Sequence, residues 1–470
     1  GESSKNRWEE LPINTLQDLQ KTLVGLFGCV LDFLSEIRRW VLAVSHSTGG
    51  DADSGSASAR PSIVDLWALH RLGLECSRVL GVWVAEDPES LPQRFLEALP
   101  VLLALNAGEE APDSDDEESD DDDDASATVT PTLAAFPTAA RYLAGGARVG
   151  HAASASSATR PDEALHNILR AMLALSYEPT PLAAMVEEGV AARLARLAAA
   201  GPPAIAALLL LGKTSSNADD DGGELHTSPP EHVSEAVRSP LVSACGLLTN
   251  ILTSAGHLAW PEDWPVAAGG SGSARRRDAG SQQPRGAPSH PVLGHPGMGQ
   301  CLASLAEVAG AAGAARRAGG GARWRLLAAH ATLVVMTVAR AATPGNGLAP
   351  AAGLAGRRPR RWSGEEGDAP GNSASPSVWE GMARAVDEAL GSLSATPGRG
   401  LIGGGKGGAG EEEEEEASFE EGAIWQWCLE CAKEIEAAPG GLAGNAYVSC
   451  RVVPRRVLRS LKEASADGRI

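Results

Sequence analysis

The chain has few aromatic residues, no long apolar runs and little cysteine. Aromatic residues make up 4% of its 470 residues. Apolar stretches such as 204–211 and 328–339 are shorter than the roughly 18 to 20 residues that a membrane-spanning helix needs. Seven cysteines scattered along the chain do not form the disulfide framework of a small secreted domain. We therefore predict a cytoplasmic protein without a transmembrane segment.

A basic surface is also lacking. The formal net charge is −20, from 40 Lys plus Arg against 60 Asp plus Glu. Two tracts account for the whole excess, because residues 109–124 hold 12 acidic residues and residues 411–421 hold 8. Proteins that bind nucleic acid neutralise its phosphates with clustered Lys and Arg, so we expect no nucleic-acid partner.

The acidic tracts and the many glycines and prolines predict long disordered insertions. Gly and Pro together contribute 84 residues, and dense like charge resists burial. Ser114 and Ser119 each have an acidic residue three positions on, so they are candidate phosphoacceptors for acidophilic kinases. Two interpretations of the tracts stay open: a solvated loop, or an electrostatic attraction for basic proteins.

No arrangement of residues in the sequence indicates catalysis or cofactor binding. Cys428 and Cys431 have the spacing of a zinc half-site or redox pair, but no His follows His330, and two cysteines three apart on a helix can simply pack. Gly212-Lys213-Thr214 lacks the first glycine of a phosphate-binding loop, since position 207 is Ala. We therefore predict no catalytic, cofactor-binding or metal residues, no cofactor and no enzymatic activity.

The apolar residues recur at helical spacing in islands. Residues 16–44, 63–84, 91–105 and 162–200 show the pattern most clearly. We expect Ser90, Asp162 and Thr180 to cap helices.

Within the last of these islands we expect breaks between short helices. Gly189 is expected to close a short helix in a left-handed conformation, and another helix should follow Gly201-Pro202-Pro203. Three helices in about forty residues suggest an armadillo-type repeat. An unspecialised helical bundle remains the alternative.

The order of several islands resembles the neurochondrin family. The run 78–87 (RVLGVWVAED), followed by Ser90-Leu91 and by 96–103 (LEALPVLL), is similar to a helix pair of that family. Residues 162–197, 244–254 (beginning ACGLLTN) and 326–340 (LLAAHATLVVMTVAR) are similar to the segments that follow. The resemblance implies an armadillo-like, cytoplasmic, non-enzymatic protein that acts through protein contacts, and it brings no catalytic residues.

These observations predict an all-α, armadillo-like α-solenoid interrupted by acidic and Gly/Ala-rich insertions. We predict a protein-binding scaffold or regulator of the neurochondrin type, with protein partners of unknown identity. The alternative is an acidic chaperone or transport adaptor that binds basic proteins through the tracts. The expected segments are a helical repeat region (11–105), an acidic disordered insertion (106–160), armadillo-like repeats (161–265), a disordered linker (266–300), a second helical repeat region (301–393), a Gly-rich and poly-Glu linker (394–418) and a short helical tail (419–470).

Overall fold

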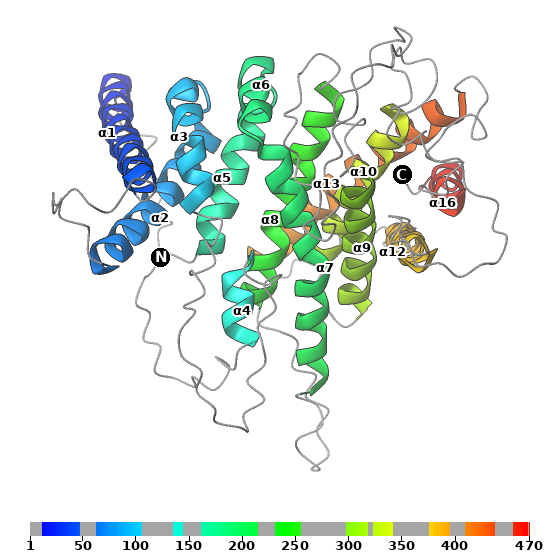
Figure 1. Cartoon of the computed structure of the whole chain (residues 1–470). Helices are drawn as coiled ribbons and strands as arrows, with labels where there is room; N and C mark the ends of the chain where they lie inside the picture. Colours follow the sequence, from blue (N-terminus) through cyan, green and yellow to red (C-terminus); the bar gives the residue numbers. More distant parts are fainter. Residues whose placement is uncertain are drawn as a thin grey trace, which may run out of the picture. The chain divides into compact units, whose positions relative to one another are not determined.

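The all-α class predicted from the sequence is confirmed for the described part of the chain. The computed structural model describes residues 12–47, 63–105, 135–143, 161–214, 231–254, 298–317, 323–341, 376–394, 409–437, 455–468 and 470. These residues form thirteen helices and no strand (Figure 1). The helices are α1 (Ile13–Ser47), α2 (Ile63–Glu86), α3 (Pro92–Leu105), α4 (Pro137–Leu143), α5 (Pro161–Leu175), α6 (Pro179–Glu187), α7 (Val190–Thr214), α8 (Glu231–Ser254), α9 (Met298–Arg317), α10 (Arg323–Ala341), α12 (Pro376–Ser394), α13 (Ala409–Ala437) and α16 (Arg455–Ala466).

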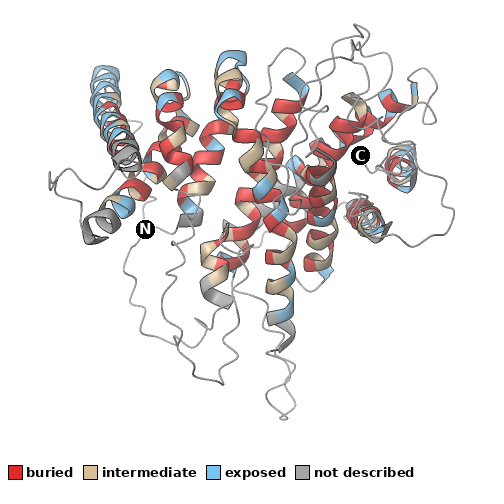
Figure 2. Cartoon of the chain, viewed as in Figure 1, coloured by how far each residue is buried: buried red, intermediate tan, exposed pale blue. Residues whose placement is uncertain are grey.

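The chain divides into two compact units, and the division falls inside α6. Unit 1 comprises Gly1–Asp116 and Ala155–Pro181, and it contains α1, α2, α3 and α5. Unit 2 comprises Glu117–Ser154 and Leu182–Ile470, and it contains α4 and the helices from α7 onward. Each unit has its own core of buried apolar residues. Figure 2 shows buried positions on the facing sides of the helices.

In unit 1, α2 and α5 lie side by side and parallel. The Arg78 guanidinium is 3.6 Å from the Glu163 carboxylate, and the Arg170 guanidinium is 3.6 Å from that of Glu86. Because the partners' numbers rise together along both helices, the helices run in the same direction. Between these ion pairs Gly81 lies against the backbone of Asn167, so the missing side chain allows a close approach.

The first helix of unit 1 packs on α3 and α2. Arg94 on α3 donates to the Gly28 carbonyl oxygen at 3.0 Å and also pairs with Asp32, both on α1. The rings of Phe27 and Trp83 stack with their centroids 4.7 Å apart, which joins α1 to α2. Apolar packing and one ion pair therefore hold this helix on the rest of the unit.

In unit 2, helices that are next but one in sequence also pack in parallel. Gly310 on α9 lies against Gly381 on α12, and Gly313 lies against Ala385 one turn further along both helices. α10 and α13 pack in the same direction, since α10 residues 325 and 340 pair with α13 residues 421 and 434 respectively. Within this unit α7 packs on α9, α9 on α12 and α12 on α16, while α8 packs on α10 and α10 on α13; the sequence neighbours α9 and α10, and α7 and α8, also pack together.

Helix ends agree only partly with the predictions. Gly189 adopts φ 71°, and its N–H donates to the Val186 carbonyl oxygen at 3.0 Å, so the left-handed end of α6 is confirmed. The predicted cap at Ser90 is wrong, because its hydroxyl bonds to the Asp87 carboxylate while α3 begins at Pro92. Asp162 and Thr180 lie inside the first turns of α5 and α6, since each helix begins one residue earlier at a proline.

The predicted break at Gly201-Pro202-Pro203 is also wrong. α7 runs without interruption from Val190 to Thr214. Each internal proline costs a helix roughly 3 kcal/mol, but the buried stripe of Leu194, Leu197, Ala204 and Leu208 continues across the prolines. Packing of this stripe in unit 2 outweighs the local preference.

A segment predicted to be a disordered insertion and one predicted to be a linker both contain helix. α4 lies within the expected insertion 106–160, and Phe136, just before it, is fully buried in unit 2. α13 begins at Ala409, so residues 409–418 are helical rather than linker. Glu is a good helix former, and carboxylates near a helix N-terminus are favoured by the helix dipole, which explains why the glutamate run continues a helix.

One helix contains an apolar segment longer than the apolar runs seen in the sequence. Residues Val190–Leu210 of α7 have a mean hydropathy of 1.3 and meet the length and composition of a membrane span. The segment carries Arg193 and Arg196, and it packs against α8 and α9 within unit 2. A core helix of a helical protein has the same properties.

Candidate functional site

A charged pocket lies between α12 and α16 in unit 2. α16 is strongly amphipathic, because Val457, Leu458, Leu461 and Ala464 are buried while most of its other residues are exposed. These four residues recur at helical spacing and hold the helix on the unit. The polar face that remains borders the pocket.

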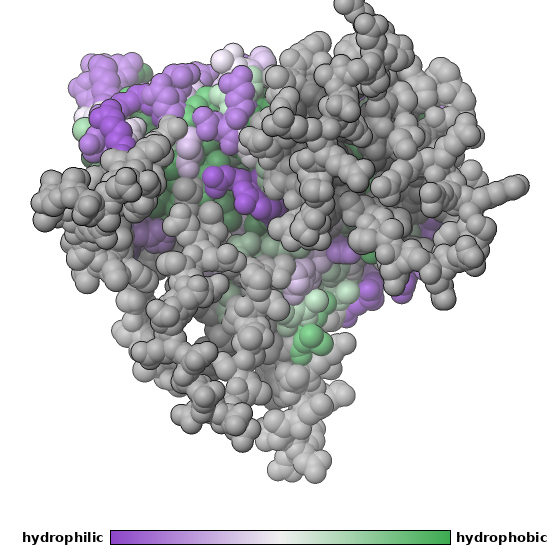
Figure 3. All heavy atoms as spheres, viewed as in Figure 1, coloured by the Kyte–Doolittle hydropathy of each residue, from purple (hydrophilic) through white to green (hydrophobic). Residues whose placement is uncertain are grey.

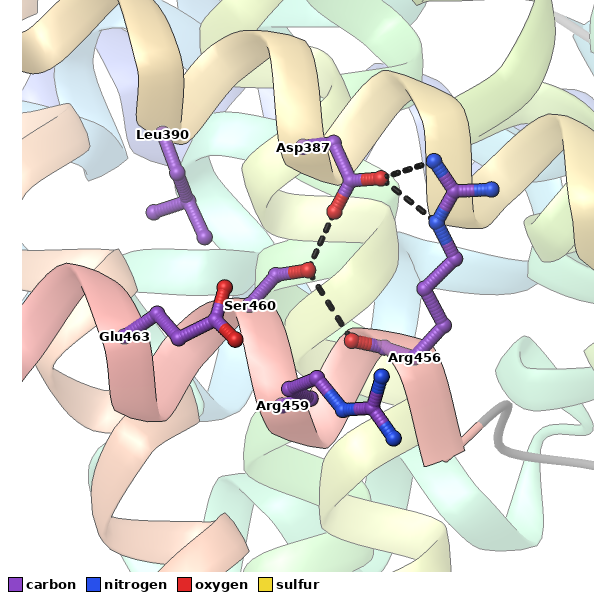
Figure 4. Close-up of a pocket in the computed structure, with 6 residues that line it drawn as sticks. All are labelled: Asp387, Leu390, Arg456, Arg459, Ser460 and Glu463. Atoms are coloured by element: carbon purple, nitrogen blue, oxygen red, sulfur yellow. Dashed lines mark hydrogen bonds and ion pairs between the residues drawn. The ribbon is translucent and has the colours of Figure 1, made fainter.

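Asp387 on α12 organises this pocket. Its Oδ2 accepts from Arg456 Nε at 2.7 Å and lies 2.5 Å from Nη2 of the same guanidinium. Its Oδ1 accepts from the Ser460 hydroxyl, which is also 2.9 Å from the Arg456 carbonyl oxygen (Figure 4). A two-pronged pair between arginine and carboxylate fixes both side chains in orientation.

The pocket has a volume of about 490 Å³, and Leu390, Arg459 and Glu463 complete its lining. The lining holds two arginines, two carboxylates and a single apolar side chain. Charges of both signs suit polar side chains of a protein partner better than an apolar cofactor. Ser460 donates to a carboxylate, and no histidine lines the pocket to act as its base, so the geometry is not that of an activated nucleophile.

A second polar group is buried between α10 and α13. The Glu421 carboxylate is 1% exposed, accepts from Trp425 Nε1 at 3.2 Å and lies 3.2 Å from Arg325 Nε. Burial raises the pKa of Glu421, and the charge of Arg325 and the bond from Trp425 oppose that rise. These contacts join two helices, which is a structural role.

Nearby, Glu420 and His330 make a more exposed contact across the same two helices. His330 Nε2 is 3.4 Å from the Glu420 carboxylate. The hydrogen bond from His330 lowers the pKa of Glu420 against the opposing effect of burial. A single His paired with a carboxylate at a helix interface stabilises that interface and makes no catalytic set with the residues described around it.

Arg238 on α8 is the most deeply buried arginine side chain among the described ion pairs. Its Nη2 lies 2.9 Å from Glu231 Oε1, and it also pairs with Glu235. Its guanidinium stands 5.7 Å from the centroid of the Trp324 ring on α10. The cluster ties α8 to α10.

The cysteine pair with the spacing of a zinc half-site lies on α13. Cys428 and Cys431 are both buried on α13, and burial raises the pKa of each thiol. Within the described residues, no three His, Cys, Asp or Glu side chains are grouped so as to hold a metal ion.

The outer face of α13 exposes large aromatic side chains. Phe419 is 82% exposed and Trp427 is 42% exposed. Ala423 and Glu430 are exposed on the same face, and the glutamate run 411–416 precedes it in the same helix. Exposed aromatics beside carboxylates can pack on the apolar stem of Lys or Arg and attract its charge.

Sequence reasoning missed the pocket residues, and its own candidates fall elsewhere. Ser114 and Ser119 lie outside the described residues. Asp387 binds Arg456 and Ser460, which lie 69 and 73 residues later in the sequence, so no local spacing of residues predicts the pocket. The amphipathic pattern of 455–466 was the available signal, because it predicts a helix with one free polar face.

Comparison with known proteins adds no relative to this description: no protein family, no curated protein and no solved structure matches the chain.

Proposed function

We propose that the protein is a non-enzymatic, cytoplasmic scaffold or regulator that binds other proteins through the surface of an armadillo-like helical repeat array. The resemblance of residues 78–103, 162–197, 244–254 and 326–340 to the neurochondrin family motivates this proposal. The proposed partners are proteins, and no cofactor or nucleic acid is part of the proposed activity.

The observation that carries the proposal is the parallel packing of alternate helices. α9 with α12 and α10 with α13 in unit 2 each pack in the same direction with one described helix between them in sequence, and α2 with α5 in unit 1 do so with α3 and α4 between them. Stacked helical repeats place equivalent helices of successive repeats in this way and leave long faces free for protein partners. Sequence neighbours such as α9 and α10 pack together here as they do in an up-and-down bundle, so the parallel pairs are the feature that favours a repeat array.

A second candidate function, binding of basic proteins, is favoured by the exposed face of α13. The aromatics Phe419 and Trp427 share this helix with the run of glutamates. An acidic chaperone or transport adaptor would use such a face together with the tract 109–124. The two functions differ in their dependence on salt, since exposed charges are screened over about 8 Å at 0.15 M.

Affinity capture from the native cell extract tests the two functions. The bait is the full chain, compared with a chain lacking 109–124 in which glutamates 411–416 are replaced by glutamine, at low salt and at moderate salt. The helical array predicts partners that stay on both baits at moderate salt. If every partner is basic and is lost with the acidic residues, the scaffold proposal fails and the second function replaces it.

The double variant Phe419→Ala/Trp427→Ala locates the contact. Exposed Leu210 and Tyr177, changed to alanine, form the matched control, because these side chains are 64% and 74% exposed and lie outside α13. Binding of basic partners should fall with the α13 variant and stay with the control. Equal loss in both variants contradicts a role for the α13 face.

A further inference from the structure

The pocket between α12 and α16 contains two charges that do not hold its helices together. Asp387 and Arg456 neutralise each other through their two-pronged pair, and Ser460 donates to the same carboxylate. Arg459 and Glu463 also line the pocket. Both are exposed, and neither side chain has an ion pair or hydrogen bond within the described part of the chain. The pocket therefore offers one free positive charge and one free negative charge.

Arg459 and Glu463 lie one turn apart on α16 and do not pair with each other. Figure 4 shows their head groups apart, on different sides of the Ser460 side chain. A basic residue four positions before an acidic one is the weaker orientation of a helical ion pair, because the reverse order also matches the helix dipole. Both charges are therefore available to a solute that enters the pocket.

The lining of the pocket carries no net charge, which restricts the class of ligand. Its two arginines balance its two carboxylates. A phosphate dianion would be repelled by Asp387 and Glu463, and a simple cation would be repelled by Arg456 and Arg459. A zwitterion satisfies both free charges at once, because its carboxylate can accept from an arginine while its ammonium donates to a carboxylate.

The dimensions of the pocket fit an amino acid. Its volume of about 490 Å³ lies within the roughly 300–1,000 Å³ of small-molecule sites. The ammonium and carboxylate of an α-amino acid share one carbon and lie about 3 Å apart. A charge-assisted hydrogen bond of about 2.8 Å at each end spans two flexible side chains one turn apart. Leu390 is the single apolar lining residue, so the ligand's own side chain should be small or polar.

Exposed apolar side chains on other helices define no comparable ligand. Leu72, Val79 and Val82 on α2 are 49%, 44% and 42% exposed. Apolar surface also shows among hydrophilic side chains in Figure 3. Small exposed apolar areas are common on protein surfaces and select no particular partner. The pocket differs because its two free charges specify complementary charges on the ligand.

We propose that the pocket between α12 and α16 binds a free α-amino acid with a small or polar side chain. Arg459 holds the carboxylate of the ligand, Glu463 holds its ammonium, and the rest of the ligand lies against Leu390. Contacts to both helices should steady α16 on α12. This inference goes beyond the proposed binding of protein partners and does not depend on it.

Isothermal titration of the full chain with glycine, L-serine and L-glutamine tests the site. At least one of the three should bind with one site per chain. Its N-acetylated form lacks the ammonium and its amide lacks the carboxylate, so each should bind about tenfold or more weakly. If none of the three binds at concentrations up to about 10 mM, or if the derivatives bind as well as the amino acid, the proposal is overturned.

Variants locate the binding. Arg459→Gln and Glu463→Gln should each weaken it about tenfold or more, with unchanged circular dichroism because both side chains are exposed. The matched control is Glu430→Gln/Lys433→Gln, since these exposed charges on α13 do not line the pocket. It should bind as the wild type does. Binding that survives both pocket variants, or that the control loses equally, contradicts the assignment.

Discussion

The close approach of α2 and α5 makes Gly81 a sensitive position, and Gly81→Ala should destabilise unit 1. A Cβ at this position would lie 2.6 Å from the Asn167 carbonyl carbon, 2.8 Å from its oxygen and 2.9 Å from its Cβ. Ordinary contacts begin at 3.4 Å, so the helices must separate by about 0.8 Å. The atoms that Cβ meets are mostly backbone, which cannot rotate away.

The expected loss follows from two opposing effects. Overpacking of a well-packed interface costs about 1–3 kcal/mol. Replacing a helical glycine by alanine gains about 1 kcal/mol in helix propensity. We therefore expect a net loss of up to about 2 kcal/mol in the free energy of unfolding, visible in urea unfolding and as faster hydrogen exchange in α2 and α5.

Gly25 on α1 provides the control. Nothing lies within 4 Å of a Cβ built at this position. Gly25→Ala should therefore stabilise the protein by about 0.5–1 kcal/mol. If Gly81→Ala is as stable as Gly25→Ala, the close contact of α2 with α5 at Gly81 and Asn167 is refuted.

Three further predictions concern unit 2 and the thiols. Burial raises the pKa of Glu421, so the folded state binds this proton more tightly than the unfolded chain, and stability falls as pH rises from about 4.5 through the raised pKa. The stability of the wild type relative to Glu421→Gln should therefore decrease in urea unfolding as the pH rises above about 4.5, and an increase would contradict the buried carboxylate. Leu461→Ala should lower the free energy of unfolding by about 2–4 kcal/mol and speed hydrogen exchange in α16, because Leu461 is fully buried. Asp387→Asn removes a partly exposed ion pair and should lower it by less than about 1 kcal/mol. Equal losses in the two variants would show that the ion pair, and not the apolar packing, holds α16 on the unit. At pH 8, iodoacetamide should label exposed Cys29 quickly, as peptide mass spectrometry would show, and rapid native-state labelling of the buried thiols would refute the packing of α8, α9 and α13. The thiols expected to stay unlabelled until unfolding are Cys245, Cys301, Cys428 and Cys431.

Local patterns were enough to predict several helices closely. The spacing of apolar residues placed α1, α2 and α3 within about three residues of their observed ends. Gly189 was predicted correctly because its left-handed conformation depends on neighbouring residues alone. Periodicity failed for α4, where a single buried aromatic precedes seven residues, too few to show a pattern.

The sequence by itself determined the class of structure, since apolar residues at helical spacing and the absence of alternating patterns leave helices as the only way to bury a core. It also determined the charge distribution, which is a property of composition. Tertiary structure decided that α7 continues through Pro202 and Pro203, because the burial that offsets their cost comes from other helices. Tertiary structure alone brought Asp387 to Arg456. It also left the Leu16 and Leu26 side chains exposed. Contact and exposure depend on which helices pack together and not on the order of residues within one helix.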